Sequence, residues 1–165
     1  MTDFVHVTGV AGRVRLRLAP NTAAVLHHTL TDVAARLAGS DRRTGIPDRR
    51  LFPDAYDSRE PSAAFRDRHG AAMRAEVAAT FARVLTAWAG RTELDLDLAG
   101  VRDLRLALAH AQTVTLRQTR WKTSGTGLFA TRWGAERTAV WLQDLESHLA
   151  TAALARGDVP VFLEL

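Results

Sequence analysis

The sequence contains no cysteine, and Lys122 is its only lysine. The missing cysteine excludes thiol catalysis, disulfide bonds, cysteine-ligated zinc and thiol-based redox sensing by this chain. No apolar run approaches the roughly 18 residues that a membrane-spanning helix needs. The first residues also lack the basic start and the apolar stretch of a secretion signal. We therefore expect a cytoplasmic protein that has no membrane partner.

The composition is that of one folded domain covering residues 1–165. Of its 165 residues, 47% are hydrophobic and 24% are charged, which is enough to bury a core without disulfides. The basic residues other than the one lysine are 21 arginines, set against 18 acids, and the net charge is +4. Residues 1–50 and 111–138 each carry +4, whereas residues 139–165 carry −3. The positive charge is therefore concentrated in two segments.

The first part of the chain predicts a β-hairpin followed by a helix. Apolar and polar residues alternate from Phe4 to Leu18, with glycines between the two runs. The predicted second strand has Val14, Leu16 and Leu18 on one face and Arg13, Arg15 and Arg17 on the other. The helix that follows is capped by Asn21 or Thr22 and ends before Gly39. Its inward residues are Leu26, Leu30, Val33 and Leu37.

Further helices are predicted over about residues 61–68, 70–89, 99–118 and 135–155, with loops over residues 40–53 and 119–134. Asp57 and Ser58 mark a capping site, and Asp97 caps the helix that starts near residue 99. The inward residues are Met73, Val77, Phe81, Val84, Leu85 and Trp88, then Val101, Leu104, Leu108 and Ala111, then Val140, Trp141, Leu145, Leu149 and Ala152.

Two short segments indicate extended structure. Leu94 and Leu96 alternate with acids, which predicts an extended entry into the helix near residue 99. Residues 159–165 predict a terminal strand, and the N-terminal hairpin offers it an edge. We therefore expect an α+β fold, mainly helical, with four to five helices and a small sheet from the hairpin and a C-terminal strand.

Patterns for catalysis or metal binding are missing. His27 and His28 are adjacent and point about 100° apart on a helix, unlike an i, i+4 pair of metal ligands. Ser124 lies in Thr-Ser-Gly-Thr-Gly, which is neither a hydrolase elbow nor a P-loop. His110 and His148 fall near inward helix faces but have no visible partner. We expect no catalytic residue, no metal, no cofactor and no enzyme activity.

The most suggestive segment interleaves cations with aromatic residues: Arg117, Arg120, Trp121, Lys122, Arg132, Trp133 and Arg137. Guanidinium groups neutralise phosphates and indoles stack on bases, so this composition favours nucleic-acid contact. A second basic surface could combine the arginines of the predicted strand with Arg42, Arg43, Arg49 and Arg50. The alternative is that the arginines only solvate the surface and the tryptophans anchor a loop to the core.

The string from Arg49 to Tyr56 resembles a family known as domain of unknown function 2017, whose members carry Leu-Phe-Pro-Asp-Ala-Tyr. The residues of the string are Leu51, Phe52, Pro53, Asp54, Ala55 and Tyr56, and the resemblance runs from about residue 12 to residue 154 through Ala64-Phe65-Arg66, Asp103-Leu104-Arg105-Leu106 and Trp141-Leu142-Gln143-Asp144-Leu145. The string also has a structural explanation, because its aromatic residues would pin a loop while Pro53 fixes the backbone.

The resemblance implies an actinobacterial cytoplasmic protein with no established enzyme activity, often encoded near Clp-protease adaptor and sulfur-carrier genes. Some members of the family are described as oxidative-stress transcriptional regulators that sense through cysteines, which this chain lacks. Two hypotheses follow. The first is a regulatory or interaction protein that contacts DNA or the transcription apparatus. The second is a protein-binding accessory factor of regulated proteolysis or sulfur metabolism, and homodimerisation stays open in both.

Overall fold

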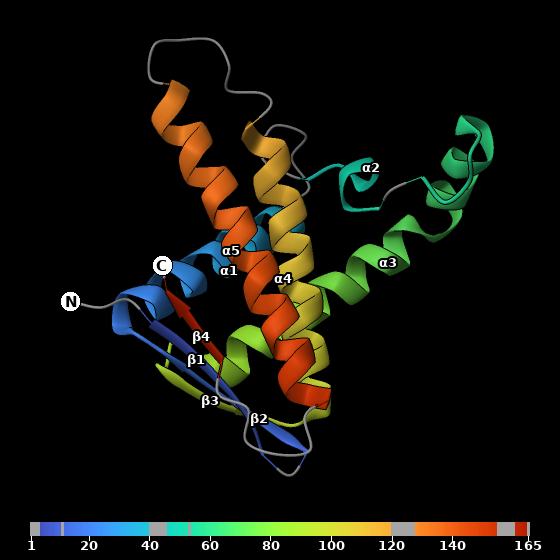
Figure 1. Cartoon of the computed structure of the whole chain (residues 1–165). Coiled ribbons are helices and arrows are strands. Elements are labelled where there is room, and N and C mark those ends of the chain that lie inside the picture. The colour runs from blue at the N-terminus through green and yellow to red at the C-terminus, as the bar shows by residue number, and fades with distance from the viewer. Residues whose placement is uncertain are drawn as a thin grey trace.

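The computed structural model describes residues 4–10, 12–39, 46–52, 54–119, 128–154 and 161–164. Its elements are β1 (Phe4–Val10), β2 (Arg13–Leu18), α1 (Pro20–Ala38), α2 (Asp48–Leu51), α3 (Arg59–Trp88), β3 (Glu93–Leu96), α4 (Leu98–Thr119), α5 (Leu128–Leu154) and β4 (Val161–Glu164). Helices α4 and α5 lie side by side, and the helices occupy one side of the sheet (Figure 1). The predicted α+β, mainly helical fold is confirmed.

The strands form one antiparallel sheet in the order β3-β2-β1-β4. Strand β2 alternates between exposed and buried residues, so its apolar side chains face the helices and its arginines face outward. The predicted C-terminal strand is confirmed, because β4 pairs with β1 and places Val5 opposite Leu163. The extended segment before α4 is more than an entry into the helix. It is a paired edge strand, β3, in which Leu94 stands opposite Leu16.

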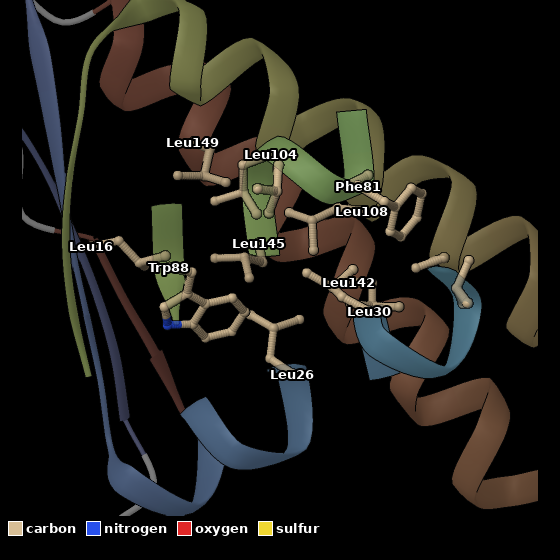
Figure 2. Close-up of a cluster of buried hydrophobic side chains, with 14 of the residues drawn as sticks. Leu16, Leu26, Leu30, Phe81, Trp88, Leu104, Leu108, Leu142, Leu145 and Leu149 are labelled. Carbon is tan, nitrogen blue, oxygen red and sulfur yellow. The ribbon is translucent and has the colours of Figure 1, made fainter. Parts of the chain in front are cut away.

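The core lies between the sheet and the helices, where Trp88 and Phe81 are the largest fully buried side chains (Figure 2). The predicted inward faces of α1 and α4 are buried, as are Val77, Phe81, Val84 and Trp88 of α3. On α5 one prediction is wrong. Val140, which was predicted to face inward, is 57% exposed, whereas Leu142, which was not predicted to face inward, is fully buried. Apolar residues occur at both positions, and only packing against α4 decides which of them faces inward.

The structure corrects the predicted helices at α1, α2 and α5, and at α3 as described below. Helix α1 begins at Pro20, and neither Asn21 nor Thr22 caps it; proline suits the first turn because its missing N–H would be unpaired there. Helix α2 lies inside the predicted 40–53 loop, of which residues 40–45 and 53 are outside the described residues. Helix α5 begins at Leu128 rather than near residue 135, which shortens the predicted loop.

Helix α3 is continuous over 30 residues, whereas the sequence predicted a break between residues 68 and 70. Gly70 remains helical, and a Cβ added there would lie 3.0 Å from a carboxylate oxygen of Asp48. A glycine inside a helix costs about 1 kcal/mol relative to alanine. Gly70 therefore permits the close approach of α2 instead of ending the helix.

Two capping predictions have different outcomes. The N–H of Gly100 donates a hydrogen bond of 2.7 Å to Oδ1 of Asp97, which confirms the predicted cap of α4. Ser58 is the N-cap residue of α3, as predicted, but its side chain makes no capping hydrogen bond. Ser62, one turn later, is fully buried and bonds to the preceding loop instead.

Candidate functional site

The α4–α5 hairpin carries most of the predicted nucleic-acid-binding residues, and two polar contacts set its register. Nε of Arg105 donates a hydrogen bond of 2.7 Å to Oε1 of Glu146. Farther along the pair, Nε2 of Gln112 donates to Oε1 of Gln143 at 3.0 Å. The helices run antiparallel, so each step toward the end of α4 corresponds to a step back toward the start of α5.

This register brings distant parts of the predicted patch to one end of the hairpin. Continuing it from Gln112 places position 117 level with the region of position 137 on α5. Positions 132 and 133 lie one to two turns closer to the start of α5 than position 137, at the same end of the hairpin. The tertiary structure therefore groups backbone positions that the sequence separates by 15 to 20 residues.

The side chains of the patch are described only in part. Arg137 is exposed on α5. The side chains of Arg117, Arg132 and Trp133 lie outside the described part of the structure, although their backbone is helical. Arg120, Trp121 and Lys122 lie outside the described residues altogether. The end of the hairpin at which α4 ends and α5 begins is therefore the candidate nucleic-acid-binding site. This choice rests on where the backbone places these positions and on their residue types.

The second predicted basic surface is paired with acids. Strand β3 lies beside β2 and presents Glu93 and Asp95 on the same outer face as the three arginines. Arg13 Nε lies 2.9 Å from Asp95 Oδ1, and the Nε atoms of Arg15 and Arg17 lie 3.6 and 3.4 Å from Glu93 Oε1. Phosphates would have to displace these carboxylates, so β2 does not offer a free row of cations.

The rest of that second surface adds little to a basic patch. Arg42 and Arg43 lie outside the described residues, as does the side chain of Arg50. Arg49 is exposed on α2 and has an interaction of its own within the molecule. The described structure therefore does not assemble the second predicted surface.

The first half of the family string is a structural anchor. Leu51 and Phe52 are buried at the end of α2. The ring of Phe52 packs edge-on against the ring of His110 on α4, with centroids 6.4 Å apart. Burial lowers the pKa of His110 below its ordinary value, because the charged ring would lose its hydration. Pro53 lies outside the described residues.

The second half of the string builds a projecting arm, which we define as residues 54–72. The first half of α3 extends away from the body, and the segment before it doubles back along the helix (Figure 1). The Asp54 carboxylate pairs with the Arg66 guanidinium, and the Tyr56 ring meets the Phe65 ring edge-on at 6.2 Å. The matched segments Leu-Phe-Pro-Asp-Ala-Tyr and Ala-Phe-Arg therefore contact each other.

A hydroxyl group fixes the arm near the start of α3, at the outer end of the arm. Oγ of Ser62 donates a hydrogen bond of 2.9 Å to the Tyr56 carbonyl and accepts one of 3.1 Å from the Tyr56 N–H. The backbone at Tyr56 is thus held on both sides, while the residue itself is 53% exposed. Tyrosine is among the residue types that are enriched at the energetic centres of protein interfaces.

Arg74 is a structural residue that the sequence reasoning missed. Its Nε donates a hydrogen bond of 2.8 Å to Oδ1 of Asp48, and its NH1 donates one of 3.2 Å to the carbonyl of Leu37. Its NH2 bonds to the carbonyl of Ile46. One guanidinium thereby joins α1, α2 and α3. Its sequence position gave no signal, because its partners lie 26 to 37 residues away.

Two negative findings apply to the described residues. No group of three or more His, Asp or Glu side chains in that part of the chain could hold a metal ion. None of the helices there is both long enough and apolar enough to cross a membrane.

These features define a small α+β domain that consists of a sheet, a helical hairpin and a projecting arm. Residues 1–148 match the model of the family described as "Domain of unknown function (DUF2017)", and the chain belongs to that family. The match confirms the resemblance carried by the Leu51–Tyr56 string. No curated protein and no solved structure matches the chain significantly.

Proposed function

We propose that this protein is a non-enzymatic regulatory protein that contacts nucleic acid through the end of the α4–α5 hairpin at which α4 ends and α5 begins. One observation carries the proposal: the hairpin register groups positions 117, 132, 133 and 137 at one end of the molecule. The residues that join the two helices in sequence add Arg120, Trp121 and Lys122 to the same segment.

The chemistry of this segment suits a nucleic acid. Arginine and lysine neutralise backbone phosphates and release condensed counterions, which supplies affinity without sequence specificity. Tryptophan offers a flat surface on which an exposed base stacks. A regulator that contacts DNA in this way acts inside the cell, so the cytoplasmic location belongs to the proposal.

A second function, a protein-binding accessory factor, is favoured by a different observation. The arm presents Tyr56 on a rigid projection, and the strand arginines that could have met phosphates are paired with Glu93 and Asp95. In this function the arginines solvate the surface and the arm meets a protein partner.

The salt dependence of DNA binding tests the first function. The binding constant for a short duplex is measured by fluorescence anisotropy between 50 and 200 mM salt, at roughly neutral pH. The triple variant Arg117→Ala, Arg120→Ala, Lys122→Ala should flatten the log–log slope by about 2.7, since each lost phosphate contact contributes about 0.9.

The matched control is the triple variant Arg13→Ala, Arg15→Ala, Arg17→Ala. It removes the same number of positive charges, three, from the ion-paired face of β2. Its slope should stay near that of the wild-type protein. Equal slopes for the two triple variants would contradict the site, because net charge alone would then explain binding. The absence of salt-dependent binding by the wild-type protein would overturn the nucleic-acid function and favour the accessory factor.

A further inference from the structure

The side of the α4–α5 hairpin that points away from the core, which we call the outer face, carries apolar side chains. In the described part of the chain six large hydrophobic residues are exposed, and four of them belong to this hairpin: Leu98 and Leu106 of α4, and Val140 and Leu154 of α5. Helices α1 and α3 pass behind the hairpin in Figure 1, and no labelled element covers its near side. The apolar residues of the outer face are therefore open to a partner.

Helix periodicity places these side chains on the side opposite the core. Successive helical residues are about 100° apart, so Leu106 lies nearly opposite Leu104 and Leu108, which are fully buried. On α5, Leu154 follows Val140 by two seven-residue repeats, and each such repeat drifts by only about 20° around a helix. Both helices thus present an apolar stripe to solvent.

The register of the hairpin brings the stripes of the two helices together. Nε of Arg105 donates to Oε1 of Glu146, and the helices are antiparallel. Leu98 lies about two turns before Arg105, and Leu154 lies about two turns after Glu146, so the two leucines are level with each other. They are 58% and 84% exposed. This end of the hairpin, beside the sheet, therefore carries a leucine patch on its surface.

The charges of the outer face balance. Arg105 and Glu146 pair with each other, with NH2 of Arg105 2.6 Å from Oε1 of Glu146. Arg102, one turn from Leu98 and from Leu106, is exposed, as is Asp144, one turn after Val140. Neither side chain forms an ion pair with another described residue. Because one free cation and one free anion cancel, the face does not favour a strongly charged partner, and two copies of it do not repel each other.

The size of the outer face is near the lower limit for a specific dimer. The stretch from Leu98 to Thr113 on α4, with residues 140–154 beside it on α5, is about 22 Å long at 1.5 Å per residue and about 20 Å wide for two helices. Two such faces packed together bury roughly 1,000 Å² in total, which is the area of a weak but specific interface. We therefore expect a dissociation constant in the micromolar range.

We propose that the outer face of the α4–α5 hairpin is the interface of a homodimer, in which the hairpins of two copies pack face to face. A two-fold axis makes such a contact self-complementary, because each copy presents the same apolar stripe and the same balanced charges. Two stacked hairpins form a four-helix bundle, which buries apolar helix faces. The interface leaves out residues 117–137, so dimerisation does not depend on nucleic-acid binding.

Sedimentation equilibrium of the full chain without nucleic acid tests the proposal. Between about 1 and 300 µM the wild-type protein should show a monomer–dimer equilibrium with a Kd of about 1–100 µM. The test variant is Val140→Glu, and its matched control is Val25→Glu on α1, since these valines are 57% and 56% exposed. Val140→Glu brings two like charges into one apolar interface and should weaken the dimer at least tenfold. Val25→Glu should stay within about twofold of wild type.

A second variant tests whether both helices contribute. Leu106→Glu changes α4 instead of α5 and should also weaken the dimer at least tenfold. Unfolding midpoints of the three variants establish that each is folded. A wild-type protein that stays monomeric, equal dimerisation of Val140→Glu and Val25→Glu, or a dimer that Leu106→Glu leaves intact would each overturn the proposal. Assemblies that grow beyond the dimer would overturn it as well, because a two-fold interface closes after two copies.

Discussion

The Arg74 guanidinium allows a quantitative prediction, because its partners differ in kind. The pair with Asp48 involves a carboxylate that is 40% exposed, whereas the Arg74 side chain itself is only 25% exposed. Two further bonds go to the backbone carbonyls of Leu37 and Ile46. Removal of Arg74 breaks all of these bonds, while removal of Asp48 breaks only the ion pair.

The two substitutions should therefore differ in size. A solvent-exposed ion pair contributes about 0.2–1 kcal/mol, so Asp48→Ala should lower the free energy of unfolding by about 1 kcal/mol at most. Each hydrogen bond from a charged group to a carbonyl adds roughly 1–1.5 kcal/mol after screening. Arg74→Ala should then cost about 2–4 kcal/mol, which corresponds to roughly 4–16 °C in Tm for a chain of this size.

Urea denaturation of both single variants and of the double variant measures this difference. The double variant should be about as unstable as Arg74→Ala, because the ion pair is already lost in the single variant. Arg74→Lys should recover part of the stability, since an ammonium keeps the charge but cannot reach all three partners. If Asp48→Ala and Arg74→Ala lowered stability equally, the backbone carbonyls would contribute nothing and the reasoning would be refuted.

Two other predictions concern the sheet and the anchor of α2. Gly9→Ala should lower the free energy of unfolding by about 1–3 kcal/mol, because a Cβ at position 9 would lie 2.2 Å from the carbonyl oxygen of Ala152 on α5. Thermal unfolding measures this loss. An unchanged Tm would show that β1 does not pack this closely against α5. The lowered pKa of His110 means that the unfolded chain binds more protons below about pH 6.5, so stability should fall as the pH drops below that value. His110→Leu should remove this part of the pH dependence in denaturation curves at pH 5 and 7, and an unchanged dependence would contradict the burial of the ring.

The local periodicity of the sequence predicted most of the fold. Alternation over residues 13–18 predicted the buried and exposed faces of β2, and the 3.6-residue spacing of Val77, Phe81, Val84 and Trp88 predicted the inner face of α3. Such patterns succeed because a side chain's face is set by the geometry of its own element. They failed at Gly70 and Val140, where the outcome depends on a neighbouring helix.

The candidate sites were less predictable than the fold. The sequence identified the arginines and tryptophans of residues 117–137 by type, and the match of residues 1–148 confirmed the family suggested by the Leu51–Tyr56 string. The sequence did not indicate that Asp54 and Tyr56 would contact Arg66 and Phe65 to form an arm.

The sequence by itself determined the composition of the surface, the inward faces of most elements and the absence of thiol chemistry. Only the tertiary structure decided which arginines are available to bind a partner. Glu93 and Asp95 pair with arginines that precede them by more than 75 residues. It also decided that positions 117 and 137 meet at one end of a hairpin. The physical reason is that periodicity reports the environment of one residue, whereas pairing depends on contacts between segments that are distant along the chain.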